Sequence, residues 1–414
     1  MPARRLSRIE VARRAHNPVV TDPRPADAPV SLRHIPDPAG IDRARTLPAA
    51  WYADDTFHRH ELQRVFRSDW VCAALTDELP PRKGWSAISV AGLPVLLVRD
   101  AGGDLRAFLN VCRHRASPLC DTGATGSGSV IRCPYHAWVY RLDGTLAKAS
   151  GVGTPAGFDV GDFALKPVAV ACWRRTVWIN VADPSAVFDT GPLAAAIDQF
   201  PLESFELALS ETHLRPFNWK VLLENYSENY HTPFVHPQID TSAREDYPMV
   251  SEGRVLYAWD RPLRASNDPS DQIRATLLPG EPGWELLAAS STERPYDVGS
   301  YLTIWPNAML NVFPDAALVM WVEPVDATTT RVERRLLLAE GRSPAEAQAI
   351  VESHRLVHEQ DVDICTRVQR SHTAGLDADG VLATTEERGV FFVHEHLRRA
   401  LAVDAIESQA RDPR

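Results

Sequence analysis

Two cysteine–histidine pairs carry the most recognisable chemistry in this sequence of 414 residues. Cys112 precedes His114 by two positions, Cys133 precedes His136 by three, and eighteen residues separate the two pairs. Each pair offers one thiolate sulfur and one imidazole nitrogen. Four such ligands can hold a zinc ion tetrahedrally. They can also hold a [2Fe–2S] cluster with both cysteines on one iron and both histidines on the other.

Two further histidines, His231 and His236, indicate a second metal site. Residues 220–230 contain no Gly or Pro, so we expect a helix there, ended by Pro233. Glu228 and His231 would share one face of that helix. His236 would lie on the turn just beyond it and point back toward His231. Two imidazoles with one carboxylate form the facial triad of non-haem iron(II) enzymes.

The carboxylate must come from elsewhere in the chain. A capping box with Pro at the first helical position predicts a helix over 343–370. Asp361 and Cys365 would share its apolar face, whereas Asp363 would point elsewhere. Burying a carboxylate without a partner costs several kcal/mol. A metal ion would be such a partner, so Asp361 is the predicted third ligand and Asp363 the alternative.

Short strands surround the first motif. Alternating and apolar runs, bounded by Gly, Pro and Asp, predict a small antiparallel β unit closed by a hairpin at 168–181. In that hairpin we expect Cys172 to be a small buried residue. Ligands on loops between short strands favour the [2Fe–2S] cluster, because common zinc sites use paired Cys-x-x-Cys knuckles or histidines on a helix.

The second half predicts an antiparallel meander followed by the long helix at 343–370. Its strands fall at 299–305, 308–313, 316–323 and 331–339. Residues 238–298 read as a long connection or a lid. The fold class is therefore α+β, with an arm at 1–48 that we expect to be flexible, a β domain at 49–182 and a catalytic domain at 183–414.

Composition excludes several other classes of protein. A formal net charge of −10 argues against nucleic-acid binding, and no apolar run is long enough to span a membrane. The basic N-terminus lacks the apolar core of a signal peptide, and six cysteines in so long a chain form no disulfide framework. We therefore expect a reduced, cytoplasmic protein.

The residues around both motifs resemble the α subunits of Rieske non-haem iron, or ring-hydroxylating-type, oxygenases. The first half matches in Asn110-Val-Cys-Arg-His-Arg-Ala and in 133–144; the second matches in Asn218-Trp-Lys and Glu228-Asn-Tyr-His231. The resemblance covers about 51–400. It implies a Rieske [2Fe–2S] domain followed by a helix-grip, START-like catalytic domain. It assigns the cluster to Cys112, His114, Cys133 and His136, and a mononuclear Fe(II) to His231, His236 and Asp361.

The same resemblance gives Glu228 the place of an acid that carries electrons from the cluster of one subunit to the iron of the next. That role implies a head-to-tail homotrimer. Many relatives have Asp there, and Glu resembles the choline, glycine betaine and carnitine monooxygenase branch. Respiratory Rieske proteins add a disulfide pair, but its positions here are Ser117 and Tyr135. The resemblance therefore implies the low-potential type of cluster.

The predicted activity is that of a terminal oxygenase that uses O2. No Gly-rich dinucleotide motif occurs, so NAD(P)H electrons would arrive from a separate reductase or ferredoxin. The small organic substrate would be hydroxylated or demethylated. A quaternary ammonium compound would need an aromatic cage, for which the sequence offers Tyr257, Trp259, Tyr301, Trp305 and Trp321. Two alternatives are an aromatic-ring dihydroxylating dioxygenase and a Rieske electron carrier with a ligand-binding domain.

Overall fold

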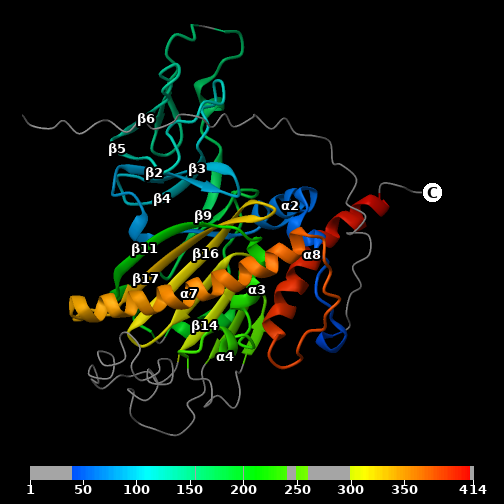
Figure 1. The fold of residues 1–414 in the computed structure, drawn as a ribbon. Helices are drawn as coiled ribbons and strands as arrows, with labels where there is room; N and C mark the ends of the chain where they lie inside the picture. The colour runs from blue at the N-terminus through cyan, green and yellow to red at the C-terminus, as the bar shows by residue number, and fades with distance from the viewer. Residues whose placement is uncertain (1–39, 154, 199, 240–248, 260–298, 411–414) are drawn as a thin grey trace, which may run out of the picture.

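The computed structural model describes residues 40–153, 155–198, 200–239, 249–259 and 299–410. Figure 1 shows two β units, one formed by the first half of the chain and one by the second, with helices on the second. Neither α7 nor any other helix in the described ranges is long and apolar enough to cross a membrane.

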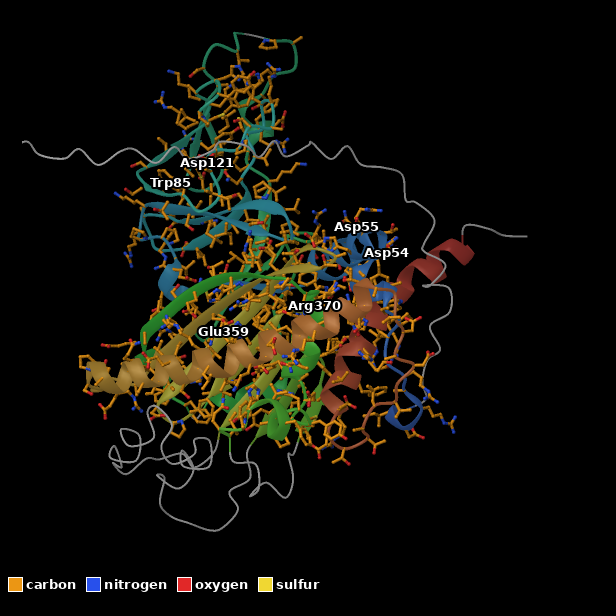
Figure 2. All side chains as sticks on the ribbon, in the orientation of Figure 1. Asp54, Asp55, Trp85, Asp121, Glu359 and Arg370 are labelled. Carbon is orange, nitrogen blue, oxygen red and sulfur yellow. The ribbon has the colours of Figure 1, made fainter. Side chains whose placement is uncertain are left out.

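The first β unit is antiparallel throughout, as predicted. Its larger sheet has the order β1 (Val71–Leu75), β10 (Thr176–Asn180), β9 (Pro167–Trp173), β4 (Leu105–Leu109), β3 (Leu93–Arg99), β2 (Gly84–Val90) and β5 (Thr125–Ser127). A smaller sheet contains β6 (Val130–Arg132), β7 (Val139–Arg141) and β8 (Leu146–Lys148). Trp85 and Asp121 mark this unit in Figure 2.

One prediction for this unit is wrong. Cys172 is exposed rather than buried. It shares the strand face of Val168 and Val170, both of which pack against the core. Cys172 lies nearer the end of β9, beyond the reach of that core.

The second sheet has seven antiparallel strands. Their order is β11 (Glu206–Arg215), β17 (Thr329–Leu338), β16 (Ala316–Asp326), β15 (Ala308–Val312), β14 (Ser300–Ile304), β13 (Val255–Trp259) and β12 (Met249–Glu252). The predicted meander is confirmed. However, β12 and β13 fall inside 238–298, where we expected no strands. Positions 240–248 and 260–298 of that segment lie outside the described residues.

Helices cover one face of this sheet, and the first β unit covers the other. On the helix side, Met309 and Met320 pack with Trp219 of α3 (Trp219–Tyr226) and Val362 of α7 (Pro344–Thr373). On the opposite side, a separate cluster joins residues of the two units, including Trp70, Trp178, Leu302, Leu310 and Trp321. Because successive side chains of a strand point to opposite faces, each residue of the sheet packs on one of these two sides.

The N-terminal segment and the last helix, α8 (Arg388–Ala410), pack together. Ala44 and Leu47 are buried, and Arg45 forms a β-bridge with Val381. Residues 40–48 therefore differ from the predicted flexible arm because their apolar side chains enter the core. Residues 1–39 lie outside the described part of the chain. Two short helices follow, α1 (Ala50–Ala53) and α2 (Asp55–Glu61).

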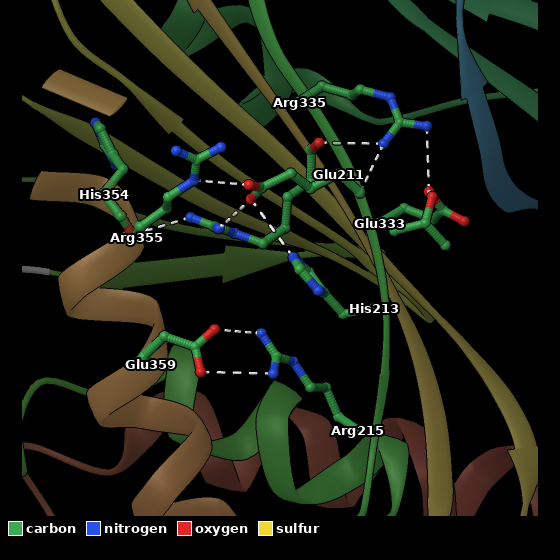
Figure 3. Close-up of polar contacts among 10 residues, drawn as sticks. Glu211, His213, Arg215, Glu333, Arg335, His354, Arg355 and Glu359 are labelled. Carbon is green, nitrogen blue, oxygen red and sulfur yellow. Dashed lines mark hydrogen bonds and ion pairs between the residues drawn. The ribbon is translucent and has the colours of Figure 1, made fainter. Parts of the chain in front are cut away.

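Ion pairs fasten α7 to the edge of the sheet (Figure 3). Arg334 of β17 is buried and donates to Glu211 of β11 over 2.9 Å and to the carbonyl of His354 over 2.9 Å. Arg355 donates to the same Glu211 over 2.7 Å, and Arg215 pairs with Glu359. Figure 2 marks Glu359 and Arg370 along α7. These contacts set the position of the helix that carries Asp361.

Candidate metal centres

The two cysteine–histidine loops have the same backbone construction. The Cys112 N–H donates to the carbonyl five residues later, and the Cys133 N–H does the same. Each cysteine carbonyl accepts from the residue four positions on, which is Ala116 or Ala137. Both alanines have a left-handed backbone, with φ of 56° and 57°. Two matched tight loops therefore present one sulfur and one imidazole each.

Burial separates the sulfurs from the imidazoles. Cys112 and Cys133 are buried, whereas His114 is exposed and His136 is partly exposed, with 4.7 Å between the imidazole centroids. Burial raises the pKa of Cys133, but backbone N–H groups, including that of His136, lower it overall. The loops thus place the sulfurs inside and the imidazoles at the surface.

Cys120 takes no part in a disulfide. Its Sγ lies 3.8 Å from Asn110 Oδ1, and it is a free thiol.

The predicted helix at 220–230 is shorter than expected. Helix α3 ends at Tyr226, and a separate one-turn helix, α4, spans Thr232–Val235. The ladder stops because Glu228 Oε2 accepts from the backbone N–H of Tyr230 and of His231. Pro233 lies in the first turn of α4, so it starts a helix rather than ending one.

This interruption brings the two histidines together. His231 and His236 are the residues that flank α4. The ligand atoms of His231, His236 and Asp361 all lie within 4.8 Å of one another. His236 Nε2 is 3.0 Å and His231 Nε2 is 3.4 Å from Asp361 Oδ1. Asp363, the alternative carboxylate, is exposed and pairs with Arg367 over 2.6 Å, away from this group.

The donor set fits a divalent metal ion. Asp361 Oδ1 is buried and has no hydrogen bond of good geometry among the described residues, although two imidazoles face it. Such a convergence of two nitrogens and one oxygen suits iron. Among the residues that the structure describes, no second group of histidine, cysteine and acidic side chains meets tightly enough for one ion.

In both imidazoles, the Nδ1 atom contacts a side-chain oxygen. The His231 Nδ1 contacts Glu228 Oε1, and His236 Nδ1 lies 2.8 Å from Gln360 Oε1. Gln238 donates to the same Gln360 oxygen over 2.7 Å. Such contacts fix the ring orientation and turn Nε2 toward the metal position. Sequence reasoning missed Gln360 and Gln238, and the only available signal was that Gln360 precedes Asp361.

The pKa values of His231 and Asp361 reflect how close these two side chains lie. Burial lowers the pKa of His231, but Asp361 and Glu228 raise it to about 9. Burial raises the pKa of Asp361, and the two histidines lower it below its usual range overall. The Asp361 carboxylate is therefore stabilised in its charged form beside His231.

The aromatic candidates for a substrate cage whose side chains are described do not meet at this centre. Tyr257 and Trp321 pack on the opposite face of the sheet, against the first β unit. Trp305 is buried beside Trp219, with 6.0 Å between ring centroids. The side chain of Trp259 lies outside the described residues. Tyr301 alone of the four described candidates packs on the helix side without being fully buried.

Two known families match successive parts of the chain. Residues 69–163 match the Rieske [2Fe–2S] domain, and residues 202–403 match the catalytic domain of the ring hydroxylating alpha subunit. Both ranges contain the candidate ligands of the corresponding centre.

Whole-protein relatives cover most of the chain. The carnitine monooxygenase oxygenase subunit of Escherichia coli K12 is 31% identical over 343 residues, covering 80% of this chain and 85% of the relative. The glycine betaine monooxygenase oxygenase subunit of Pseudomonas aeruginosa PAO1 is 34% identical, with 84% and 83% covered. The crystal structure of the quaternary ammonium Rieske monooxygenase CntA with L-carnitine has the same fold. Its TM-score is 0.70 at 24% identity, covering 87% of this chain and 97% of that one.

Proposed function

We propose that this chain, which belongs to the Rieske non-haem iron oxygenase family, oxidises a small quaternary ammonium compound. The observation that carries the proposal is the meeting of His231, His236 and Asp361 behind a Rieske domain. Relatives covering four fifths or more of the chain are named for carnitine and glycine betaine. An electron carrier, the alternative from sequence, would not need the catalytic domain that the chain contains.

We assign Cys112, His114, Cys133 and His136 to the [2Fe–2S] cluster, and His231, His236 and Asp361 to the mononuclear iron. When bound, these groups supply one-electron transfer and oxygen activation. The chain itself provides two imidazoles and one carboxylate, and three protein ligands leave the remaining coordination positions free. Residues 49–182 would form the cluster domain and 183–414 the iron domain.

Glu228 is proposed to connect the two kinds of centre. Its Oε1 contacts His231 Nδ1 while its Oε2 holds the backbone at Tyr230 and His231, so the carboxylate is fixed at the imidazole. His114 is exposed on the cluster loop and can be reached by another subunit. We infer a homotrimer in which Glu228 of one subunit faces a cluster histidine of the next.

The electrons would come from outside the chain. The sequence contains no Gly-rich dinucleotide-binding motif. A separate reductase or ferredoxin would therefore deliver electrons from NAD(P)H, and O2 would be the cosubstrate. Incorporation of one oxygen atom of O2 would hydroxylate the substrate or remove an N-methyl group as formaldehyde, and the two electrons would reduce the other atom to water.

Oxygen uptake tests this function. Purified protein, loaded with iron and sulfide, would be supplied with NADH and a surrogate reductase, and presented with choline, glycine betaine, carnitine or benzoate. We expect substrate-dependent O2 consumption with at least one quaternary ammonium compound, and an oxygenated or demethylated product by mass spectrometry. Uptake with benzoate alone would contradict the substrate class and support a ring-hydroxylating enzyme.

A further inference from the structure

The helix-facing side of the second sheet forms a largely apolar floor that packs against α3 and α7. Strand pairing places Tyr301 opposite Asn311, and Asn311 opposite Leu318. We use the term sheet floor for this set: Leu256, Ala258, Tyr301, Thr303, Met309, Asn311, Leu318 and Met320. The residues of the sheet floor include no acid and no base.

The end of α3 is docked on the sheet floor. Ser227 Oγ and Thr303 Oγ1 share a hydrogen bond of 3.0 Å. The adjacent Tyr226 donates its hydroxyl to Asn311 Oδ1. The sheet floor therefore contacts the end of α3, five residues before His231 in the chain.

Two residues of the sheet floor are not fully buried. Leu256, Met309 and Met320 are each at most 5% exposed. In contrast, Tyr301 and Asn311 keep intermediate exposure in the middle of a seven-stranded sheet. Side chains at such positions are normally covered completely by the packed layer above. Tyr301 and Asn311 are therefore the two residues of the sheet floor that solvent reaches.

The amide oxygen of Asn311 has a hydrogen-bond partner, whereas its amide nitrogen has none among the described residues. Tyr226 fills Oδ1, and no described residue accepts a hydrogen bond from Nδ2. This amide nitrogen carries two donor hydrogens. Thr303 has its partner in Ser227, so Asn311 is the group of the sheet floor that offers unused N–H donors.

We propose that Asn311 is a specificity-determining residue whose Nδ2 donates to the carboxylate of a quaternary ammonium acid. A trimethylammonium group accepts no hydrogen bond, so it cannot be the partner of Nδ2. A carboxylate accepts strongly because the bond is charge-assisted. Tyr226 acts as a positioning residue, because it holds the amide with Nδ2 turned away from its own hydroxyl.

This inference rests on the proposed function and narrows its substrate to the acids, such as glycine betaine and carnitine, over choline. The test compares the holoenzyme with its Asn311→Asp and Asn311→Leu variants. The Asp side chain keeps the shape but replaces the donor with a negative charge. The Leu side chain removes the donor without adding charge. Tyr226→Phe tests the positioning contact.

For both Asn311 variants we expect kcat/KM for glycine betaine or carnitine to fall by about 10- to 100-fold, as for loss of a hydrogen bond to a charged group. Asn311→Asp should lose more than Asn311→Leu. The ratio of choline to acid turnover should rise in both, and Tyr226→Phe should shift it by only about 2- to 5-fold. The Kd of the acid, from calorimetry, should weaken in parallel, while the visible spectrum of the cluster stays unchanged.

Each remaining outcome is decisive. If the wild-type protein oxidises acids but the choline-to-acid ratio is the same in all variants, the role of Asn311 is wrong and the proposed function stands. If the wild-type protein prefers choline and Asn311→Asp does not impair it, the carboxylate assignment is wrong. If the wild-type protein oxidises no quaternary ammonium compound, the proposed function and this inference are both wrong.

Discussion

The cysteine–histidine loops and the histidine–aspartate centre are built over very different lengths of chain. All four candidate ligands of the first lie within residues 112–136, on two loops with the same hydrogen-bond pattern. The second joins His231 and His236 to Asp361, which is 125 positions after His236 and lies on another helix. The first centre needs local turns, whereas the second needs the helix α7 to be placed correctly on a sheet.

The two centres also differ in which of their candidate ligands are buried. The cluster loops hide sulfur and expose imidazole, which suits a group that must exchange electrons with other proteins. The histidine–aspartate centre buries His236 and encloses Asp361, which suits a site that must exclude water. If this contrast is correct, substitutions in the two centres should be separable by experiment.

The largest effect is expected from Cys112→Ser. Loss of one thiolate should prevent assembly of the [2Fe–2S] cluster, so the visible spectrum disappears and turnover falls by roughly 100-fold or more. The histidine–aspartate centre should still bind one iron per chain, measured by metal analysis after reconstitution. Retention of the full cluster spectrum in this variant would contradict the assignment.

Asp361→Ala should give the opposite result. Turnover should fall by about 100-fold or more because the facial triad is incomplete, while the cluster keeps its colour. Asp363→Ala is the matched control on the same helix, since its exposed carboxylate pairs with Arg367. It should change turnover by less than about 2-fold. Equal losses in both variants would show that helix α7, rather than the Asp361 carboxylate, had been damaged.

A smaller effect is expected from Gln360→Leu, which leaves every candidate ligand in place. Removing the oxygen that contacts His236 Nδ1 should weaken iron binding by about 10- to 100-fold, as for other groups that orient a metal-bound imidazole. Titration of the metal-free protein with Fe(II) under anaerobic conditions measures this. Unchanged affinity would mean that His236 is oriented by its other neighbours.

The smallest effect on turnover should come from Glu211→Gln, which loosens α7 from the sheet edge (Figure 3). Burial raises the pKa of Glu211, but Arg355, His213 and Arg334 lower it overall from the ordinary value of 4.5. A lowered folded-state pKa means that its stabilisation is complete above 4.5 and is lost as the pH falls further. We expect a loss of about 1–3 kcal/mol in unfolding free energy at neutral pH.

The difference between wild type and Glu211→Gln should shrink as the pH drops below 4.5, and urea unfolding at several pH values measures it. A difference that persists at acidic pH would indicate lost packing rather than lost charge.

The contrast between the centres also explains what the sequence could predict. Spacing along the chain identified the cysteine–histidine loops because turns of a few residues position those ligands. Asp361 could be separated from Asp363 because helical periodicity decides which carboxylate faces the core. The antiparallel meander of the second half followed from alternation and turn residues.

Other features depend on contacts that no local pattern encodes. The helix break after Tyr226 results from side-chain bonds of Glu228 to the following backbone, not from a breaker residue. Tyr257 and Trp321 were grouped with Tyr301 as possible cage residues, but strand register puts them on the opposite face. The contact of Gln360 with His236 joins positions 124 apart.

The iron and sulfide content of the reconstituted protein tests most directly whether the chain contains two different iron centres. We predict three irons and two acid-labile sulfides per chain, because a [2Fe–2S] cluster supplies two irons and the facial triad one. Asp361→Ala should contain two irons and two sulfides. A wild-type protein with zinc and no sulfide, or with two irons unaffected by Asp361→Ala, would contradict the account.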